Sequence, residues 1–279
     1  MHTRPTRSAL YIPGSKDRAL EKARSLPVDV ILFDLEDAVA PDAKIAARDT
    51  LFAALASGYG PRQRIVRINA LDTEWGRADA AAVAAMDCDA ILLPKVNSTA
   101  DVDALAALVP DVPFWAMMET PLGVLNAASI AAHPRIAGFV MGTNDLAKDM
   151  GSRGRPALMT ALQMCLLAAK AAGIVALDGV YNAFQDEDGL RAECAEGRDM
   201  GFDGKTLIHP AQIAIANAAF GPTEDEIALA HRQIAAFTEA EANGQGVAVV
   251  DGKIVENLHI VTAKATLAKA EAIAALESA

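Results

Sequence analysis

Acidic side chains follow several short apolar segments of this sequence, and two of them suit a metal ion. Glu119 ends the segment FWAMME, and Asp145 follows the segment IAGFVMG. Paired carboxylates with little histidine nearby are typical of a hard divalent cation that keeps several of its waters. We therefore expect Glu119 and Asp145 to bind Mg²⁺, with Mn²⁺ as a substitute. Helix caps or a salt-bridged pair would use the same residue types.

Another acidic cluster, Asp34-Leu35-Glu36-Asp37, belongs to a second apolar segment. Glu36 and Asp37 can hold water that is itself bound to the metal ion, and we expect Asp37 to contribute to catalysis. Asp34 is expected to point elsewhere, because alternate residues of a strand face opposite sides of a sheet.

Arg67, in the segment RIVRIN, is the cation expected beside these carboxylates. A guanidinium group can bind a substrate carboxylate through two parallel hydrogen bonds. Next to a metal ion, this indicates a 2-oxo or 2-hydroxy acid that chelates the metal, which would stabilise an enolate or a developing oxyanion. We therefore expect Arg67 to act in binding and catalysis. An internal ion pair with Glu36 or Asp37 is the alternative.

Lys16, Arg18 and Lys22 fall at the start of a predicted helix, after the first apolar segment. We expect Lys16 and Lys22 at the mouth of the site, where they could bind a phosphate-bearing part of the substrate. Ordinary surface charge is the alternative interpretation.

The elements that must position these residues are eight short apolar segments that alternate with stretches of helical periodicity. The segments span 9–14, 29–39, 64–69, 90–96, 114–119, 136–142, 174–180 and 202–210, and the clearest helical stretches span 16–25, 101–109, 158–172 and 187–200. This alternation predicts a closed parallel (β/α)8 TIM barrel, whose polar strand ends meet at one catalytic face. A doubly wound open sheet is the alternative, but no strand leads into a GxGxxG turn.

The residues after Gly221 predict an appendage to this barrel. A helix over 224–242 is followed by a hairpin, GQGVAVVDGKIVENLH, and a helix over 261–278. Asp251-Gly252 is a typical hairpin turn pair. We therefore expect a barrel domain over 1–221 and a helix–hairpin–helix extension over 222–279.

Composition narrows the class of protein. The net charge of −11 disfavours a nucleic-acid binder, and no apolar run approaches the roughly 20 residues that span a bilayer. The three cysteines are scattered without a CxxC pair. We therefore expect a cytoplasmic enzyme with reduced thiols, no zinc site and no membrane partner.

Several motifs, taken together, resemble one known family. They are LYIPGSKDRALEKA, DLEDAV, VRIN, LPKV, MMETPLG, MGTNDLAKDMG and GKTLIHPAQ, and the similarity runs from about residue 8 to the C-terminus. The chain resembles the citrate lyase β-subunit-like family, which includes malyl-CoA lyases, citramalyl-CoA lyases and malyl-CoA thioesterases. The resemblance implies a Mg²⁺-dependent (β/α)8 enzyme that acts on the CoA thioester of a hydroxy-dicarboxylic acid.

The resemblance also implies roles for individual residues. Glu119 and Asp145 match metal ligands, and Arg67 matches the residue that holds the substrate's carboxylate end, with help from the Asn144–Asp145 backbone. Positions that contact CoA or substrate are matched by Tyr11, Lys16, Lys22, Ile208 and His209. Relatives can carry arginine at the position of Lys16. The family typically forms trimers or hexamers in which the C-terminal extension of one subunit covers the site of a neighbour.

The tail motif bears on the type of reaction. In the lyases of this family the tail supplies a catalytic aspartate in a pattern like G-x-x-[VI]-D, whereas this chain has Gly252-Lys253-Ile254-Val255-Glu256. The longer side chain moves the carboxylate by about 1 Å, and errors of that size can cost about 100-fold in rate. We therefore expect Glu256 to activate water beside a thioester carbonyl. The expected reaction is hydrolysis of (3S)-malyl-CoA to malate and free CoA.

The main alternative is a lyase of the same fold. It would cleave malyl-CoA, methylmalyl-CoA or citramalyl-CoA into acetyl- or propionyl-CoA and a 2-oxo acid such as glyoxylate. A subunit that works on an acyl-carrier partner fits less well, because the chain has its own tail and lysines that match CoA contacts. A non-catalytic relative is disfavoured by the intact Glu119, Asp145 and Arg67.

Overall fold

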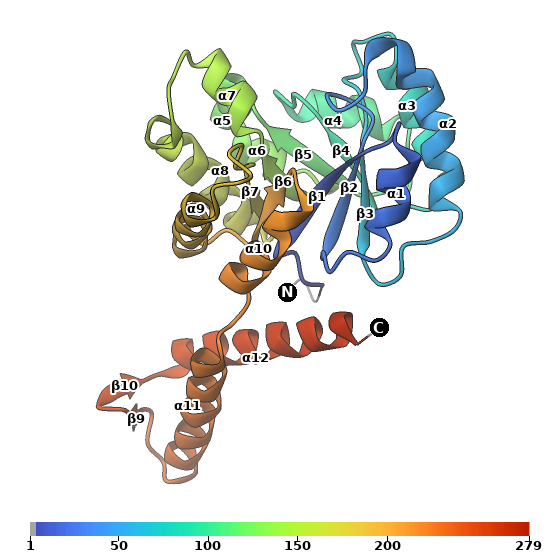
Figure 1. Ribbon diagram of the computed structural model, residues 1–279. Coiled ribbons are helices and arrows are strands. Elements are labelled where there is room, and N and C mark those ends of the chain that lie inside the picture. The colour runs from blue at the N-terminus through green and yellow to red at the C-terminus, as the bar shows by residue number, and fades with distance from the viewer. Residues whose placement is uncertain (1–3, 279) are drawn as a thin grey trace. The chain divides into compact units, whose positions relative to one another are not determined.

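Eight short parallel strands close into a barrel in the computed structural model, which describes residues 4–278 (Figure 1). Each strand pairs with the next, and β1 also pairs with β8, in a register that places Ser8 opposite Lys205. The strands are β1 (Ser8–Pro13), β2 (Val30–Asp34), β3 (Gln63–Arg67), β4 (Ala90–Leu93), β5 (Phe114–Met118), β6 (Ile136–Met141), β7 (Val175–Asp178) and β8 (Gly204–Leu207). The predicted (β/α)8 barrel is therefore confirmed, and the open-sheet alternative is wrong.

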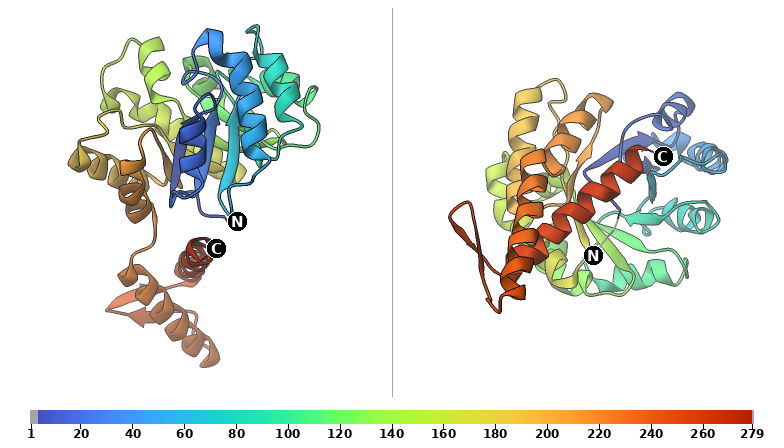
Figure 2. Two further views of the ribbon diagram at one scale, coloured as in Figure 1. Left: turned by 45° about the vertical axis from the view of Figure 1, so that its right-hand side comes forward. Right: turned by 90° about the horizontal axis from the view of Figure 1, so that it is seen from below.

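Helices follow the strands and lie outside them (Figure 2). They are α1 (Asp17–Ala23), α2 (Lys44–Leu55), α3 (Gly76–Val83), α4 (Thr99–Ala106), α5 (Pro121–Leu125), α6 (Ala127–Ala131), α7 (Thr143–Asp149), α8 (Met159–Ala172), α9 (Glu187–Met200) and α10 (Ile213–Phe220), with 3-10 turns η1 (Pro41–Ala43), η2 (Arg155–Leu158) and η3 (Pro210–Gln212). Local signals fix their ends. Asp186 caps α9 by accepting a hydrogen bond from the N–H of Gly189, and Gly201 ends it in the left-handed conformation.

The interior of the barrel is filled by alternate residues of its strands. Val30 and Leu32 of β2 and Ile65 of β3 belong to this inner cluster, and all three are fully buried. Trp115 also points inward and packs on Gly138, where an added Cβ would lie 2.6 Å from the indole ring. The inward parity of each strand therefore decides which of its last residues faces the catalytic end of the barrel.

A division by contacts separates the barrel, Thr6–Ala219, from a second unit that runs from Phe220 onward and includes Arg4 and Pro5. The second unit contains α11 (Glu224–Ala242), β9 (Ala248–Val250), β10 (Lys253–Val255) and α12 (Asn257–Glu277). Thr223 and Glu226 form a capping box at the start of α11. The hairpin turns at Asp251 and Gly252, both left-handed, as the two-residue turn requires.

A small core of its own holds the second unit together. Phe237 and Ala240 of α11 pack with Val250, Val255 and Ile260 from the hairpin and α12. Among the described residues, no helix is both long and apolar enough to span a bilayer.

Candidate active site

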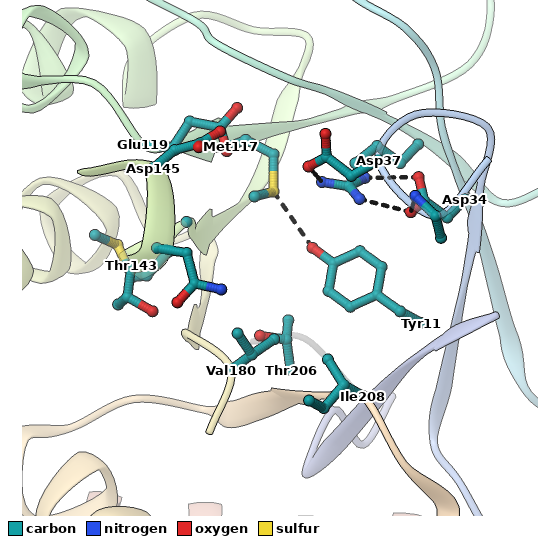
Figure 3. A pocket seen from close by; sticks show the side chains of 15 residues that line it. Tyr11, Asp34, Asp37, Met117, Glu119, Thr143, Asp145, Val180, Thr206 and Ile208 are labelled. Carbon is teal, nitrogen blue, oxygen red and sulfur yellow. Dashed lines mark hydrogen bonds and ion pairs between the residues drawn. The ribbon is translucent and has the colours of Figure 1, made fainter. Parts of the chain in front are cut away.

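A pocket of about 310 Å³ opens at the carboxyl ends of the barrel strands (Figure 3). Its volume is at the lower end of the range for small-molecule sites. The residues that line it come from most of the strand ends. They are Tyr11, Asp34, Asp37, Ala38, Arg67, Met117, Glu119, Met141, Gly142, Thr143, Asn144, Asp145, Val180, Thr206 and Ile208.

Glu119 and Asp145, the predicted metal ligands, both line this pocket. Glu119 directly follows β5, is 2% exposed, and accepts a hydrogen bond at Oε1 from the main-chain N–H of Lys95 (2.8 Å). Gly142 leaves room for it, because a Cβ there would lie 2.6 Å from Glu119 Oε2. Burial raises the pKa of Glu119 to about 7 and the Asp145 carboxylate adds to the rise, although the Lys95 N–H and Arg67 act against it. Burial and a second carboxylate disfavour the charged form of Glu119, and a bound cation would favour it.

The donor set fits Mg²⁺. Among the described residues there is no group of three or more His, Cys, Asp or Glu side chains arranged to hold a metal ion. Mg²⁺ keeps several waters and is commonly bound by one or two carboxylates together with substrate oxygens. Glu119 and Asp145 therefore suffice as its protein ligands, with the remaining positions left to water and substrate.

Arg67 lines the same pocket as these carboxylates, but its guanidinium group is bound to acids of the protein. Nε and Nη2 donate to the two oxygens of Asp34 at 2.8 and 2.6 Å. Nη1 lies 2.9 Å from Glu36 Oε2 and 3.3 Å from Asp37 Oδ2. The ring of Tyr11 covers the guanidinium, with its centroid 4.8 Å away. The internal pairing with Glu36 and Asp37, the alternative considered for Arg67, is present.

The prediction for Asp34 was wrong. Asp34 is 1% exposed and lines the pocket, because it shares the inward parity of Val30 and Leu32 on β2. Its oxygens also accept the main-chain N–H groups of Glu36 (2.9 Å) and Ala38 (3.0 Å). The side chain therefore both orients Arg67 and folds the acidic loop that follows β2.

Glu36 is buried, and burial raises its pKa to about 8; Arg67 acts against this rise, and Asp37, Glu119 and Asp34 add to it. Lys44 holds the main chain beneath this loop. Its ammonium group donates to the carbonyl oxygens of Leu35 (3.1 Å) and Glu36 (2.7 Å) and to Asn69 Oδ1 (2.7 Å). The loop that carries Glu36 and Asp37 is thus fixed from below by a buried cation.

Tyr11 and Ile208, predicted to contact substrate or CoA, line the pocket, and Asn144 lies at its edge. The Tyr11 hydroxyl donates to the Met117 sulfur (3.5 Å), and burial raises the pKa of the phenol. Asn144 exchanges side-chain hydrogen bonds with Asn182, the shorter at 2.7 Å.

Glu36, Lys16, Lys22 and His209 of the predicted barrel residues do not line the pocket. His209 accepts the N–H of Ala211 at the start of η3 and packs on Phe184, with ring centroids 4.7 Å apart. Lys16 is exposed just before α1, on the catalytic side of β1. Lys22 is exposed in the last turn of α1, roughly 9 Å further along the helix axis. The structure therefore separates the two lysines that we expected at one mouth.

Glu256 belongs to the second unit, which contains no other predicted site residue. It is exposed at the junction of β10 and α12, and its main-chain N–H donates to His259 Nδ1 (3.0 Å). The structure thus defines the conformation of Glu256 within its own unit.

Comparison with known proteins identifies the family. The sequence pattern of the HpcH/HpaI aldolase/citrate lyase family matches residues 7–210. The chain belongs to this family. A (3S)-malyl-CoA thioesterase of Cereibacter sphaeroides is 70% identical over 97% of this chain and 96% of its own length. The citrate lyase subunit beta of Escherichia coli is 35% identical over 96% of this chain and 94% of its own length.

A solved structure of the same family covers both units. The protein CitE from Mycobacterium tuberculosis, in complex with magnesium, acetoacetate and coenzyme A, matches with a TM-score of 0.82 and 31% identity. The match covers 96% of this chain and 98% of that one. The resemblance inferred from the motifs is therefore confirmed.

Within this family site, sequence reasoning missed Asp34, Lys44 and Lys95. Counting alternate positions from Val30 would have turned Asp34 inward. Lys44 carried a weaker signal, a basic residue at the start of a helix after an acidic loop. The role of Lys95 depends on its backbone conformation, for which the sequence offers no signal.

Proposed function

We propose that this protein hydrolyses the thioester bond of (3S)-malyl-CoA, giving malate and free CoA with Mg²⁺ as the cofactor. One observation carries the proposal: 70% identity to a (3S)-malyl-CoA thioesterase across 97% of this chain. The solved relative with bound magnesium and coenzyme A supports the same cofactor and the same class of substrate. The sequence identity to a citrate lyase subunit beta is 35%, half of the identity to the thioesterase.

The barrel site supplies the metal ligands and binds the acyl group. Glu119 and Asp145 would hold Mg²⁺, which supplies charge to polarise the oxygens of a bound hydroxy acid. Arg67, stacked on Tyr11 and fixed by Asp34, keeps one N–H of Nη2 for a substrate oxygen. We therefore retain Arg67 as a contact for the acyl group, oriented by Asp34, with Asp37 beside the guanidinium in the wall of the pocket.

Hydrolysis needs one further group, a base that takes a proton from the attacking water. The water oxygen bonds to the thioester carbonyl carbon, the bond from carbon to sulfur breaks, and the proton passes to the departing thiolate of CoA. We propose that Glu256 is this base, and that it reaches the site of a neighbouring subunit in a trimer or hexamer. The exposure of Glu256 supports this, since a buried or paired carboxylate could not act on another subunit.

The remaining contacts of the substrate follow from the same proposal. Lys16 and Lys22 would bind the phosphates of CoA on the outside of the pocket, and Ile208 and His209 would border the chain that enters it. The three free cysteines, of which Cys165 and Cys194 are buried, suit a cytoplasmic enzyme.

The direct test is product analysis. The enzyme is incubated with (3S)-malyl-CoA and Mg²⁺, and free thiol, malate, glyoxylate and acetyl-CoA are quantified over time. We expect malate and CoA in equal amounts and in proportion to Mg²⁺ occupancy. Glyoxylate and acetyl-CoA as the main products would replace hydrolysis by the lyase reaction. No Mg²⁺-dependent turnover would reject both.

A further inference from the structure

Lys95, the second residue after β4, has an unusual backbone conformation for its residue type. Its φ is 53°, in the left-handed region, and the other non-glycine residue with positive φ in the described part of the chain is Asp251 of the hairpin turn. This conformation costs free energy for any residue with a Cβ and persists where the surroundings enforce it. In this conformation the Lys95 N–H donates to Glu119 Oε1 at 2.8 Å. The strained residue therefore fixes a predicted metal ligand.

The segment after Lys95 is held firmly by the neighbouring helix α5. Asn97 donates to the Lys95 carbonyl oxygen (3.1 Å) and accepts at its own side-chain oxygen from Thr120 (2.6 Å). Asn126 donates to the main-chain oxygen of Asn97 (2.8 Å). At Gly123, an added Cβ would lie 2.3 Å from the main-chain oxygen of Val96. These contacts determine the path of the chain at Lys95 from both sides.

The side chain of Lys95 is an unpaired cation close to the acidic site, although Lys95 is not one of the residues that line the pocket. It is exposed and forms no ion pair within 4.0 Å in the part of the chain that the structure describes. Burial lowers the pKa of this ammonium group, and the carboxylates of Glu36, Asp145, Glu119 and Asp37 together raise it above its usual value. None of these four acids forms an ion pair with Lys95 in the described part of the chain.

Arg67 differs from Lys95 in this respect, because it pairs with three acids: Nε and Nη2 donate to Asp34, Nη1 donates to Asp37, and Nη1 forms an ion pair with Glu36. The charge of Arg67 is therefore already shared among three acids of the protein before a substrate carboxylate binds. A second cation near the metal ligands would give a free substrate carboxylate a partner that these acids do not already hold.

We propose that Lys95 is that cation: its ammonium group binds the free carboxylate of the acyl group while its left-handed main chain holds Glu119. This inference rests on the proposed function, because the free carboxylate belongs to the malyl group of the proposed substrate. The substrate class is then an acyl-CoA with a carboxylate at the end of the acyl chain distal to the thioester, and an acyl group without it binds poorly.

The side-chain role is tested by replacing Lys95 with methionine, which keeps the stem and removes the charge. The Mg²⁺-loaded full-length protein is titrated calorimetrically with (S)-malate, which needs no turnover, and KM and kcat are measured for (3S)-malyl-CoA. We expect Lys95→Met to weaken malate binding and raise KM by about 10- to 100-fold, the range of a charge-assisted hydrogen bond. Lys95→Arg should recover part of the loss, and kcat should change much less than KM.

The matched control is Lys148→Met, which removes the charge of an exposed lysine on α7. It should leave malate affinity and KM unchanged. If Lys95→Met changes both by less than about threefold, the carboxylate contact is wrong. If the wild-type protein binds malate but releases no CoA from malyl-CoA, the proposed hydrolysis fails while the Lys95 contact is still decided by the titration.

The main-chain role is tested by Mg²⁺ affinity. Lys95→Gly adopts the left-handed conformation freely and should keep the Mg²⁺ dissociation constant, while it loses malate affinity like Lys95→Met. Lys95→Val resists this conformation and should weaken Mg²⁺ binding by about tenfold. Equal Mg²⁺ affinities of the glycine and valine variants would show that the left-handed main chain does not position Glu119.

Discussion

The barrel and the tail use their acidic residues in opposite ways. In the barrel, Asp34 and Glu119 are almost fully buried, and each is held by named hydrogen bonds from Arg67 or from the main chain. In the tail, Glu256 is exposed, and the apolar residues near it are exposed too: Val249 at 67%, Ile254 at 63% and Leu258 at 62%. The buried acids are positioned by contacts within the barrel, whereas Glu256 lies on an exposed surface with apolar residues near it, which is what the proposed contact with a neighbouring subunit would need.

This contrast teaches where each kind of substitution should act. Changes in the barrel should alter metal binding and stability together, because the same bonds serve both. Changes at Glu256 should alter turnover without altering stability. Substitutions in the barrel and at Glu256 can therefore be told apart by measuring metal binding, turnover and stability together.

Glu119→Gln should abolish most activity. The amide is a poor Mg²⁺ ligand, and loss of the metal removes the charge that stabilises the transition state, so we expect about a 10³-fold decrease in kcat/KM for malyl-CoA. The decrease is measured by following the release of free thiol from malyl-CoA at increasing Mg²⁺ concentrations. Glu187→Gln on α9, an exposed control, should stay near the wild-type rate. Wild-type turnover by Glu119→Gln would remove Glu119 from the metal site.

Glu256→Gln should lower kcat by about 10²-fold or more, the contribution typical of a general base. Its melting temperature should not change, because the side chain is exposed. Glu256→Asp should instead increase the fraction of glyoxylate among the products, since the shorter side chain places the carboxylate as in the lyases of this family. An unchanged product ratio would contradict the geometric argument for Glu256.

Asp34→Asn should destabilise the barrel by about 3 kcal/mol, because it leaves the buried Arg67 guanidinium without its bidentate partner. Denaturant unfolding measures the loss. The matched control is Asp251→Asn in the tail, where an exposed ion pair with Arg232 at 2.8 Å is broken. That change should cost less than about 1 kcal/mol. Comparable losses for the two variants would erase the proposed difference between the regions.

Mg²⁺ binding should weaken as the pH falls through about 7, where the buried Glu119 carboxyl takes up a proton. The folded pKa lies above the usual 4.5, so protonation favours the metal-free fold, and this contribution to stability is lost as the pH rises through 7. The increase in melting temperature caused by Mg²⁺ should therefore be larger at pH 8 than at pH 6. An increase in melting temperature that does not depend on pH would contradict this prediction. Glu119→Gln, which has no carboxyl group to titrate at this position, is the control.

Sequence periodicity was sufficient to predict the barrel, because each buried strand is short, apolar and followed by a helix. It also predicted that Glu119, Asp145, Asp37 and Arg67 meet, since parallel strand ends share one face. The inward direction of Asp34 was predictable from the parity of β2, and the expectation failed because no inner residue was used to anchor the count. The left-handed backbone of Lys95 was not predictable, because Asn97 and α5 enforce it through contacts that only the folded chain brings together.

The binding partner of the Arg67 guanidinium was not predictable from the sequence for a similar reason. Its residue type is equally suited to a substrate carboxylate and to an internal acid, and the distances in the folded protein decide between them. The separation of Lys16 from Lys22 follows from their six-residue spacing on α1, which places Lys22 roughly 9 Å further along the helix axis.

The most direct measurement of the division between barrel and tail is complementation between two inactive variants. Glu119→Gln keeps an intact tail, and Glu256→Gln keeps an intact barrel site. After the two are co-refolded in equal amounts, half of the barrels and half of the neighbouring tails are intact, so about a quarter of the sites should combine both. Our account predicts recovery of about a quarter of the wild-type rate of CoA release. A mixture no more active than the separate variants would contradict it.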